Sequence, residues 1–291
     1  MQKYAYYPGC SLGAGAKEFD VATRAVFDKL GVGLQEIPDW SCCGSSQTHK
    51  VDREVAAAVA GRNLVLAEDI GDIVAPCTSC SSSLKEAAIE LEHDGPARKL
   101  LAEAGLEYLP GSVEVVSATE AIYRALEEGL FDGKVGDQLT GVRVASYYGC
   151  LLVRPPQVAQ FDDPENPVSL DKITEAIGAV PVDWSHKTEC CGNAYFLTNK
   201  DMTLHIVTNI LNAAIDAGAD VIIAPCPLCQ QNLAERQSLM KGSYGLKREI
   251  PVLYFTQLIG MGLGIDNKHL DLSGDVMRLI NKRRQEVKEV G

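Results

Sequence analysis

Ten cysteines divide into two sets of five that share one order: a single cysteine, an adjacent pair followed by glycine, and a Cys-x-x-Cys pair. The two sets are Cys10, Cys42, Cys43, Cys77 and Cys80, and then Cys150, Cys190, Cys191, Cys226 and Cys229. In a chain without an export signal, clustered cysteines more often bind metal or do redox chemistry than form disulfides, because reducing compartments disfavour disulfides. We therefore expect two metal or redox centres.

The residues around the cysteines repeat as well. Tyr6-Tyr7-Pro8-Gly9-Cys10 is echoed by Tyr147-Tyr148-Gly149-Cys150, and both tryptophans, Trp40 and Trp184, precede a Cys-Cys pair in similar surroundings. The run from Asp72 to Cys80 matches the run from Asp220 to Cys229. Such agreement at several separate places indicates duplication of one structural unit. It predicts two modules, residues 1–139 and 140–291.

Five thiols per module decide between the kinds of metal site. Structural zinc takes four ligands, often from two Cys-x-x-Cys pairs, so zinc would leave one cysteine idle in both copies. An iron–sulfur cluster is larger and needs ligands on several irons, which adjacent cysteines can reach. Gly44 and Gly192 suit a sharp turn beside such a cluster. Since an ordinary cubane uses four cysteines, either one thiol is free for chemistry or the cluster is not an ordinary cubane.

Apolar, β-branched runs predict the strands that lead into the cysteine loops. Residues 4–7 and 142–148 end at Gly-Cys, and residues 73–75 and 221–224 end at Pro-Cys. Helical periodicity lies between these strands, on a face that includes Val55, Val59, Leu66 and Ile70 in the first module and Leu204, Val207, Leu211 and Ile215 in the second. Helices are also expected from about Ser82 and about Gln230. The fold class is therefore α/β, with a small, mainly parallel sheet flanked by helices in each module.

A strand and helix are expected to complete each module, over residues 113–128 and 251–264, and a charged helix over residues 274–289 to end the chain. In parallel sheets, ligand groups gather at the carboxyl ends of the strands. We therefore expect all three cysteine groups of a module to meet at one edge of its sheet.

Several classes of partner and cofactor are excluded by charge and by missing motifs. The net charge of −12 argues against general nucleic-acid binding, because phosphates would be repelled. No convincing nucleotide loop is present, so neither NAD nor flavin is expected on this chain, and electrons must arrive from a partner. No apolar run is long enough for membrane insertion, and the first residues do not resemble a secretory signal. The expectation is a cytoplasmic protein.

The order of the ten cysteines resembles the duplicated cysteine-rich "CCG" domain, and a chain of this length resembles the B-type subunit of heterodisulfide reductase. That family reduces the mixed disulfide of coenzyme M and coenzyme B to two thiols in methanogens. The resemblance implies that each set of five cysteines holds one non-cubane [4Fe-4S] cluster, with the two modules related by pseudo-twofold symmetry. It also implies partners, namely an iron–sulfur C-type subunit together with a flavin-containing A-type subunit. A hydrogenase or formate dehydrogenase is a further candidate.

The substrate of that family carries sulfonate, phosphate and carboxylate groups, which need cationic or N–H partners. Arg154, His186, Lys187 and Asn193 lie close in sequence to the cysteines of the second module and are the candidate substrate-binding residues. The tryptophans are expected to pack in the core or to shield the clusters. A different reading keeps the chain as a CCG electron-transfer subunit of another system, such as a bacterial disulfide reductase-like complex or lactate or glycolate oxidation.

Overall fold

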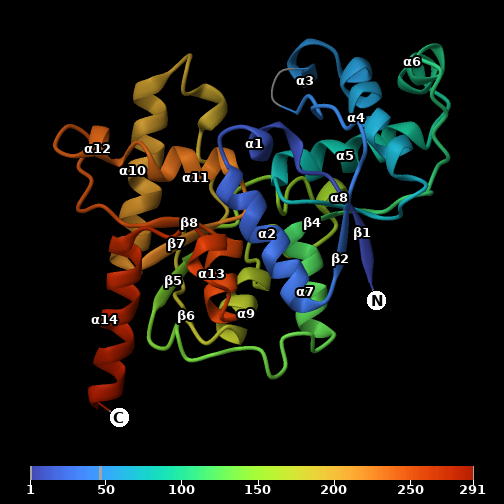
Figure 1. Cartoon of the computed structure of the whole chain (residues 1–291). Coiled ribbons are helices and arrows are strands. Elements are labelled where there is room, and N and C mark those ends of the chain that lie inside the picture. Colours follow the sequence, from blue (N-terminus) through green and yellow to red (C-terminus); the bar gives the residue numbers. More distant parts are fainter. Residues whose placement is uncertain (1, 46–47, 291) are drawn as a thin grey trace.

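The computed structural model describes residues 2–45 and 48–290, which form two four-stranded sheets. The strands of the first sheet are β1 (Lys3–Tyr6), β2 (Gly33–Glu36), β3 (Ile73–Ala75) and β4 (Val115–Ser117). Those of the second are β5 (Arg143–Ser146), β6 (Val180–Pro181), β7 (Val221–Ala224) and β8 (Val252–Tyr254). Every pairing is parallel, and the strand orders β2-β1-β3-β4 and β6-β5-β7-β8 correspond one to one. The predicted α/β fold with two similar modules is confirmed (Figure 1).

Helices flank both sheets. Those of the first half are α1 (Gly9–Gly13), α2 (Lys17–Leu30), α3 (Thr48–Val51), α4 (Arg53–Ala67), α5 (Thr78–Leu91), α6 (Pro96–Glu103) and α7 (Ala118–Glu127). Those of the second half are α8 (Pro156–Ala159), α9 (Ser169–Ala176), α10 (Lys200–Asp216), α11 (Pro227–Ala234), α12 (Gln237–Met240), α13 (Phe255–Gly262) and α14 (Gly274–Val290). Short 3₁₀ turns, η1 (Asn193–Tyr195) and η2 (Asn267–His269), complete the set.

The inner strands are the ones that the sequence shows most clearly. β3 and β7 are buried along their whole length, because helices cover both faces of the sheet, and their residues are accordingly apolar. The edge strands β2 and β6 were not predicted, since β2 is partly exposed and β6 has only two residues. α5 and α11 begin directly after Cys77 and Cys226, a few residues earlier than expected.

The expected apolar face of α4 is not its buried face. Val55 is 39% exposed, and the helix instead buries small residues such as Ala56, Ala60 and Gly61 against α5 and α6. A Cβ atom at Gly61 would lie 2.4 Å from Leu91, so the close approach of α4 and α5 requires glycine there. In α10 the expected face is buried through Leu204, Val207 and Leu211, with Ile215 half-buried.

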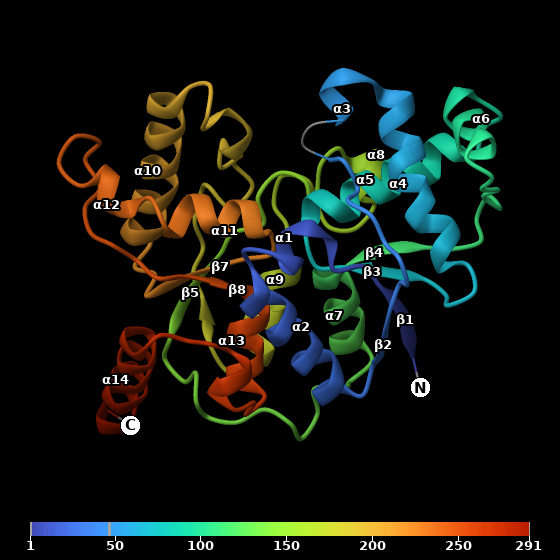
Figure 2. The same cartoon turned by 45° about the horizontal axis from the view of Figure 1, so that its top comes forward.

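The two modules pack through symmetry-related helices. α2 of the first module contacts α13 of the second, and α7 of the first contacts α9 of the second (Figure 2). These contacts are equivalent, because α2 corresponds to α9 and α7 corresponds to α13 in the two modules. The Phe19 ring stacks on Tyr254 at 4.4 Å between centroids, and the hydroxyls of Thr23 and Thr256 lie 3.4 Å apart. Within residues 2–45 and 48–290, no helix is long and apolar enough to cross a membrane.

Candidate metal centre

The cysteine groups lie in loops at the carboxyl ends of the inner strands. Cys10 follows β1 and stands at the start of α1, whereas Cys77 follows β3 and caps the N-terminus of α5. In the second module Cys150 follows β5 in a turn, and Cys226 follows β7 at the N-cap position of α11. Neighbouring parallel strands end at the same edge of a sheet, so these loops meet there.

Sulfur atoms of different loops approach one another in both sets. In the first, the Cys10 and Cys42 sulfurs are 3.6 Å apart, and those of Cys43 and Cys80 are 3.4 Å apart. In the second, the Cys191 and Cys229 sulfurs are 3.4 Å apart, and Cys150 contacts Cys190. All ten cysteines are free thiols. The structure thus brings together the members of each set as the sequence pattern implied.

Each set has an open side and a closed side. Cys10, Cys42 and Cys190 are exposed and Cys150 is half-buried. The remaining six sulfurs are buried: Cys43, Cys77, Cys80, Cys191, Cys226 and Cys229. A molecule in solution can therefore reach the first cysteine of a set and the first member of its adjacent pair.

The two sets meet at the interface between the modules. The hydroxyl of Ser79 in the first module lies 4.0 Å from the Cys226 sulfur of the second, and Cys77 and Cys226 are close enough for each to shift the pKa of the other. Both cysteines stand at helix N-termini, where the helix dipole favours negative charge. The centres held by the two modules would therefore be close neighbours.

Backbone N–H groups point at the sulfurs of the adjacent pairs. The Gly44 N–H group donates to Cys42 at 3.5 Å, and the Gly192 N–H group donates to Cys190 at 3.4 Å. Both glycines have φ above +70°, a conformation that side chains other than glycine rarely adopt. In the second module, the hydrogen bond from Cys150 and the N–H of Gly192 lower the pKa of Cys190 to about 6, against the effect of burial. These turns favour the thiolate form that metal ligands need.

Two buried tyrosines hold the adjacent cysteine pairs in place. The Tyr7 hydroxyl donates to the Ser41 carbonyl at 2.7 Å, and the Tyr147 hydroxyl donates to the Glu189 carbonyl at 2.6 Å. Each acceptor is the residue just before a Cys-Cys pair. Burial and then the nearby cysteine sulfurs raise the pKa of both tyrosines, which keeps them neutral donors. Trp40 and Trp184 pack on these same tyrosines.

The roles of these tyrosines were not predicted, although the repeated Tyr-Tyr and Gly-Cys residues carried the signal. Tyr7 corresponds to Tyr147, and Pro8 to Tyr148, because the modules align without a gap from strand to cysteine. An alignment that matches Tyr6-Tyr7 with Tyr147-Tyr148 by residue type alone is therefore shifted by one residue from the structural alignment.

We expect Tyr7→Phe and Tyr147→Phe each to lower the free energy of unfolding by about 1 kcal/mol, because each removes one largely buried hydrogen bond. Thermal unfolding of the anaerobically purified chain measures the change. The control is Tyr195→Phe, since Tyr195 is 53% exposed and should tolerate the change. A loss at Tyr195 as large as at Tyr7 would contradict the anchoring role.

Gly9 and Gly149 provide a second, matched test of the site. Both have positive φ, so alanine at either position is expected to cost about 1–2 kcal/mol of stability. A Cβ atom would lie 3.0 Å from the Cys80 sulfur at Gly9, but 3.6 Å from the Cys229 sulfur at Gly149. Gly9→Ala should therefore also lower the iron content of the chain, whereas Gly149→Ala should not. Equal iron content in Gly9→Ala and Gly149→Ala would show that a displaced Cys80 sulfur does not weaken cluster binding.

Two of the predicted substrate-binding residues are engaged in ion pairs. Arg154 pairs with Glu165 at 3.1 Å and donates to the Thr188 hydroxyl at 3.2 Å. Lys187 is 7% exposed, and its ammonium group pairs with Asp171 at 3.1 Å. These contacts hold together the loops on either side of Cys150 and Cys190. A role for either residue in substrate binding stays a prediction.

The other two predicted residues lie in different surroundings. The His186 ring is 2.7 Å from the Ser185 hydroxyl and lines a hollow formed with the C-terminal half of α10. Asn193 directly follows Gly192, and its side-chain oxygen accepts a hydrogen bond from Arg236 at 3.4 Å. Of these two residues, Asn193 is the one next to the cysteines.

α11 and the turn after it supply two side chains that sequence reasoning missed. Asn232 is buried, and its amide group donates to the Cys191 carbonyl at 2.5 Å. Arg236 lies one turn further along and stacks over the Phe196 ring at 3.5 Å. No motif in the sequence marks either residue.

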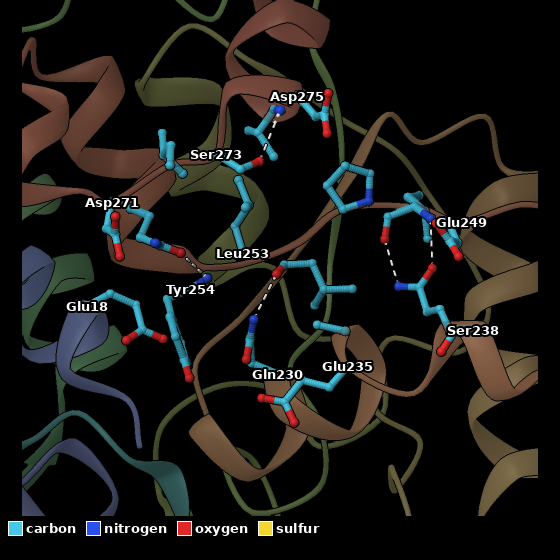
Figure 3. Close-up of a pocket in the computed structure, with 18 residues that line it drawn as sticks. Glu18, Gln230, Glu235, Ser238, Glu249, Leu253, Tyr254, Asp271, Ser273 and Asp275 are labelled. Carbon is cyan, nitrogen blue, oxygen red and sulfur yellow. Dashed lines mark hydrogen bonds between the residues drawn. The ribbon is translucent and has the colours of Figure 1, made fainter. Parts of the chain in front are cut away.

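A cavity of about 650 Å³ lies beside the centre, between α11, β8 and the N-terminus of α14 (Figure 3). Five acidic residues line it: Glu18, Glu235, Glu249, Asp271 and Asp275. No Lys, Arg or His among the described residues lines it. A smaller cavity of about 220 Å³ shares Glu18 and Glu235 with it and reaches Ser11 and Pro227, next to cysteines of both sets. The acidic lining disfavours anionic ligands on this side.

The donor set fits an iron–sulfur cluster. In the part of the chain that the structure describes, no three Cys, His, Asp or Glu side chains close around one ion-sized site. The sulfurs instead come together as pairs from three loops, with N–H groups directed at them. Ligands spread in this way suit a centre with several irons, whose potential depends on hydrogen bonds to sulfur.

Comparison with known proteins decides the family. A family model described as a cysteine-rich domain, CCG, matches residues 4–85 and again residues 144–234. The chain belongs to the CCG family of cysteine-rich proteins. Its two copies of the CCG domain confirm the duplication that the sequence predicted.

Relatives of known role align over nearly the whole chain. The 8-methylmenaquinol:fumarate reductase membrane anchor subunit of Wolinella succinogenes is 34% identical over 281 residues, which is 95% of this chain and 98% of that protein. The B-type subunit of the ferredoxin/F420H2-dependent CoB–CoM heterodisulfide reductase of Methanosarcina acetivorans is 31% identical over 292 residues, 96% of this CCG chain and 95% of that protein. The predicted resemblance to the B-type subunit of heterodisulfide reductase is confirmed.

A solved structure shares the fold. The crystal structure of a hypothetical protein from Helicobacter pylori matches with a TM-score of 0.73 at 14% identity, over 93% of this chain and 51% of that one. Together with the ten clustered thiols, the relatives make this CCG protein an iron–sulfur oxidoreductase with a role in electron transfer.

Proposed function

We propose that this chain is the disulfide-reducing subunit of a heterodisulfide reductase complex, with one non-cubane [4Fe-4S] cluster in each module. The substrate proposed is the coenzyme M–coenzyme B heterodisulfide, as in the name of the Methanosarcina relative. The observation that carries the proposal is the meeting of two equivalent five-cysteine sets at Cys77 and Cys226, where the Ser79 hydroxyl of the first module lies 4.0 Å from the Cys226 sulfur. A disulfide has two sulfur atoms, and two adjacent, symmetry-related centres match that number.

The open side of each set supports access for such a substrate. Cys10 and Cys42 are exposed in the first module, as is Cys190 in the second, so a disulfide can approach both sets from solvent. The acidic cavity lies along α11 and β8, and its carboxylates would repel a substrate with sulfonate or phosphate groups. We therefore place substrate access at the exposed cysteines and not through that cavity.

Reduction of a disulfide consumes two electrons and two protons and yields two thiols. The bound clusters would supply the electrons and iron as a Lewis acid for the thiolate sulfurs. The chain's own residues hold the geometry: Tyr7 and Tyr147 fix the adjacent cysteine pairs, and the N–H groups of Gly44 and Gly192 stabilise thiolate charge. Arg154, His186, Lys187 and Asn193 stay the proposed substrate-binding residues.

Electrons would come from a partner iron–sulfur protein. We propose a complex with subunits of the heterodisulfide reductase C and A types, with a hydrogenase or formate dehydrogenase as a further donor. The support is that the relatives are named as subunits of larger reductases.

A second candidate function is favoured by the identity of 34% to the Wolinella protein, which exceeds the 31% to the Methanosarcina protein. In that case the chain would pass electrons between a quinol and a fumarate reductase, with no disulfide as substrate. The five-cysteine sets and their open sides would then serve electron transfer alone.

One experiment separates the two functions. The purified, iron-loaded chain is incubated anaerobically with a chemical reductant and the heterodisulfide, and the free thiols are counted. We expect two thiols per disulfide and at least a tenfold loss of rate in Cys42→Ser or Cys190→Ser, which remove exposed ligands. Absence of thiol release from a chain whose clusters are fully reduced would contradict the first function and favour the second.

A further inference from the structure

The second cysteine set has a cation beside it that is not neutralised by a carboxylate. Arg236 is half-buried and makes no ion pair with any carboxylate in residues 2–45 and 48–290. Three other cations near the cysteine loops are paired: Lys85 with Glu120, Arg154 with Glu165, and Lys187 with Asp171. The carboxylate of the neighbouring Glu235 is exposed to water and salt and forms no ion pair with Arg236, so Arg236 keeps much of its positive charge.

Contacts of Arg236 direct this charge toward the Cys190–Asn193 loop. One guanidinium nitrogen donates to the Asn193 oxygen at 3.4 Å, and the guanidinium plane stacks on Phe196 at 3.5 Å. Asn232, on the helix that precedes Arg236, donates a hydrogen bond to the Cys191 carbonyl of this loop. Burial lowers the pKa of Arg236, whereas the negative charges of Glu235 and, after it, Cys191 raise it.

The first module has different residues at the aligned positions. Counted from the start of each Cys-x-x-Cys pair, Arg236 corresponds to Ala87 and Asn232 to Ser83. Ser45 corresponds to Asn193, and its backbone N–H and hydroxyl groups help to lower the pKa of Cys43. At this position the first set has the dipoles of Ser45 beside it, whereas the second set has the full positive charge of Arg236. The field of a charge extends further than the field of a dipole.

We propose that Arg236 is a positioning residue of the second cysteine set and that its charge makes the cluster held there easier to reduce. Reduction adds one negative charge to a cluster, so a nearby guanidinium stabilises the reduced form. Glu189, next to Cys190, and Glu235, next to Arg236, carry the opposite charge, but both are exposed and screened by water and salt. This inference rests on the proposed function only in taking iron–sulfur clusters to be held by the ten cysteines.

The test is a redox titration of the anaerobic, iron-loaded full chain, followed by EPR. In Arg236→Gln we expect one of the two reduction potentials to fall by about 59 mV, a tenfold change for one electron, while the other stays unchanged. Arg236→Lys keeps the charge and should recover most of the shift. Asn193→Asp places a carboxylate against Arg236 and should lower the same potential with the guanidinium still present.

Arg248→Gln is the matched control, because it removes the same charge from an exposed position in the same module. Its potentials should equal those of the wild type. Unchanged potentials in both Arg236→Gln and Asn193→Asp, or an equal shift in Arg248→Gln, would overturn the inference and leave the proposed function standing. A wild-type chain that holds no iron would instead contradict the proposed function and this inference with it.

Discussion

Replacing Cys191 by serine is expected to halve the iron content of the anaerobically purified chain, and replacing Cys43 by serine is expected to do the same. Both sulfurs are buried, and each lies 3.4 Å from the second cysteine of its Cys-x-x-Cys pair. Serine keeps the shape of the side chain but replaces a soft thiolate by a hydroxyl, which is a poor ligand for iron–sulfur clusters. Each variant should therefore lose one cluster of about four irons and keep the other.

The two variants serve as controls for each other. Because the modules repeat the same site, equal losses in Cys43→Ser and Cys191→Ser and an almost iron-free double variant are the expected pattern. Iron and acid-labile sulfide analysis measures all three proteins. Full iron content in either single variant would contradict the assignment of five cysteines to each cluster.

Phe19→Ala is expected to lower the free energy of unfolding by about 3–5 kcal/mol, as for other fully buried aromatic side chains. Phe19 is 0% exposed. Its ring stacks on Tyr254 within 3° of parallel and meets Phe255 edge-on at 6.1 Å, and both partners belong to the second half of the chain. The substitution would open a cavity at the contact between the modules, where the two cysteine sets also meet.

Denaturant unfolding of the anaerobic protein measures this change. Val21→Ala on the same helix is the control, because Val21 is 42% exposed and its loss should stay within about 0.5 kcal/mol. A loss below about 1 kcal/mol for Phe19→Ala would show that the modules are not held together by this contact.

The sequence predicted the parts of the fold that obey short-range rules. β3 and β7 are short apolar runs followed by Pro-Cys. Because both faces of these strands are buried, all of their residues are apolar, and the strands are easy to recognise in the sequence. The ten cysteines had the spacing of a repeated unit, so their gathering into two sets followed from the topology of a parallel sheet. The boundary between residues 139 and 140 stays a prediction.

What the sequence could not predict depends on contacts between distant residues. The buried face of α4 consists mostly of alanine and glycine, because α5 packs closely against it, and Val55 remains exposed. Arg154 and Lys187 looked free in the sequence, and their carboxylate partners, Glu165 and Asp171, become visible only after folding. Arg236 had no motif to mark it.

EPR spectroscopy of the iron-loaded chain, with and without coenzyme M, tests the central claim most directly. If the two sets of five cysteines hold iron–sulfur clusters that bind substrate sulfur, coenzyme M should change the EPR signal of the clusters. Cys42→Ser or Cys190→Ser should each abolish one part of that change. An iron signal that is the same with and without the thiol would contradict the account.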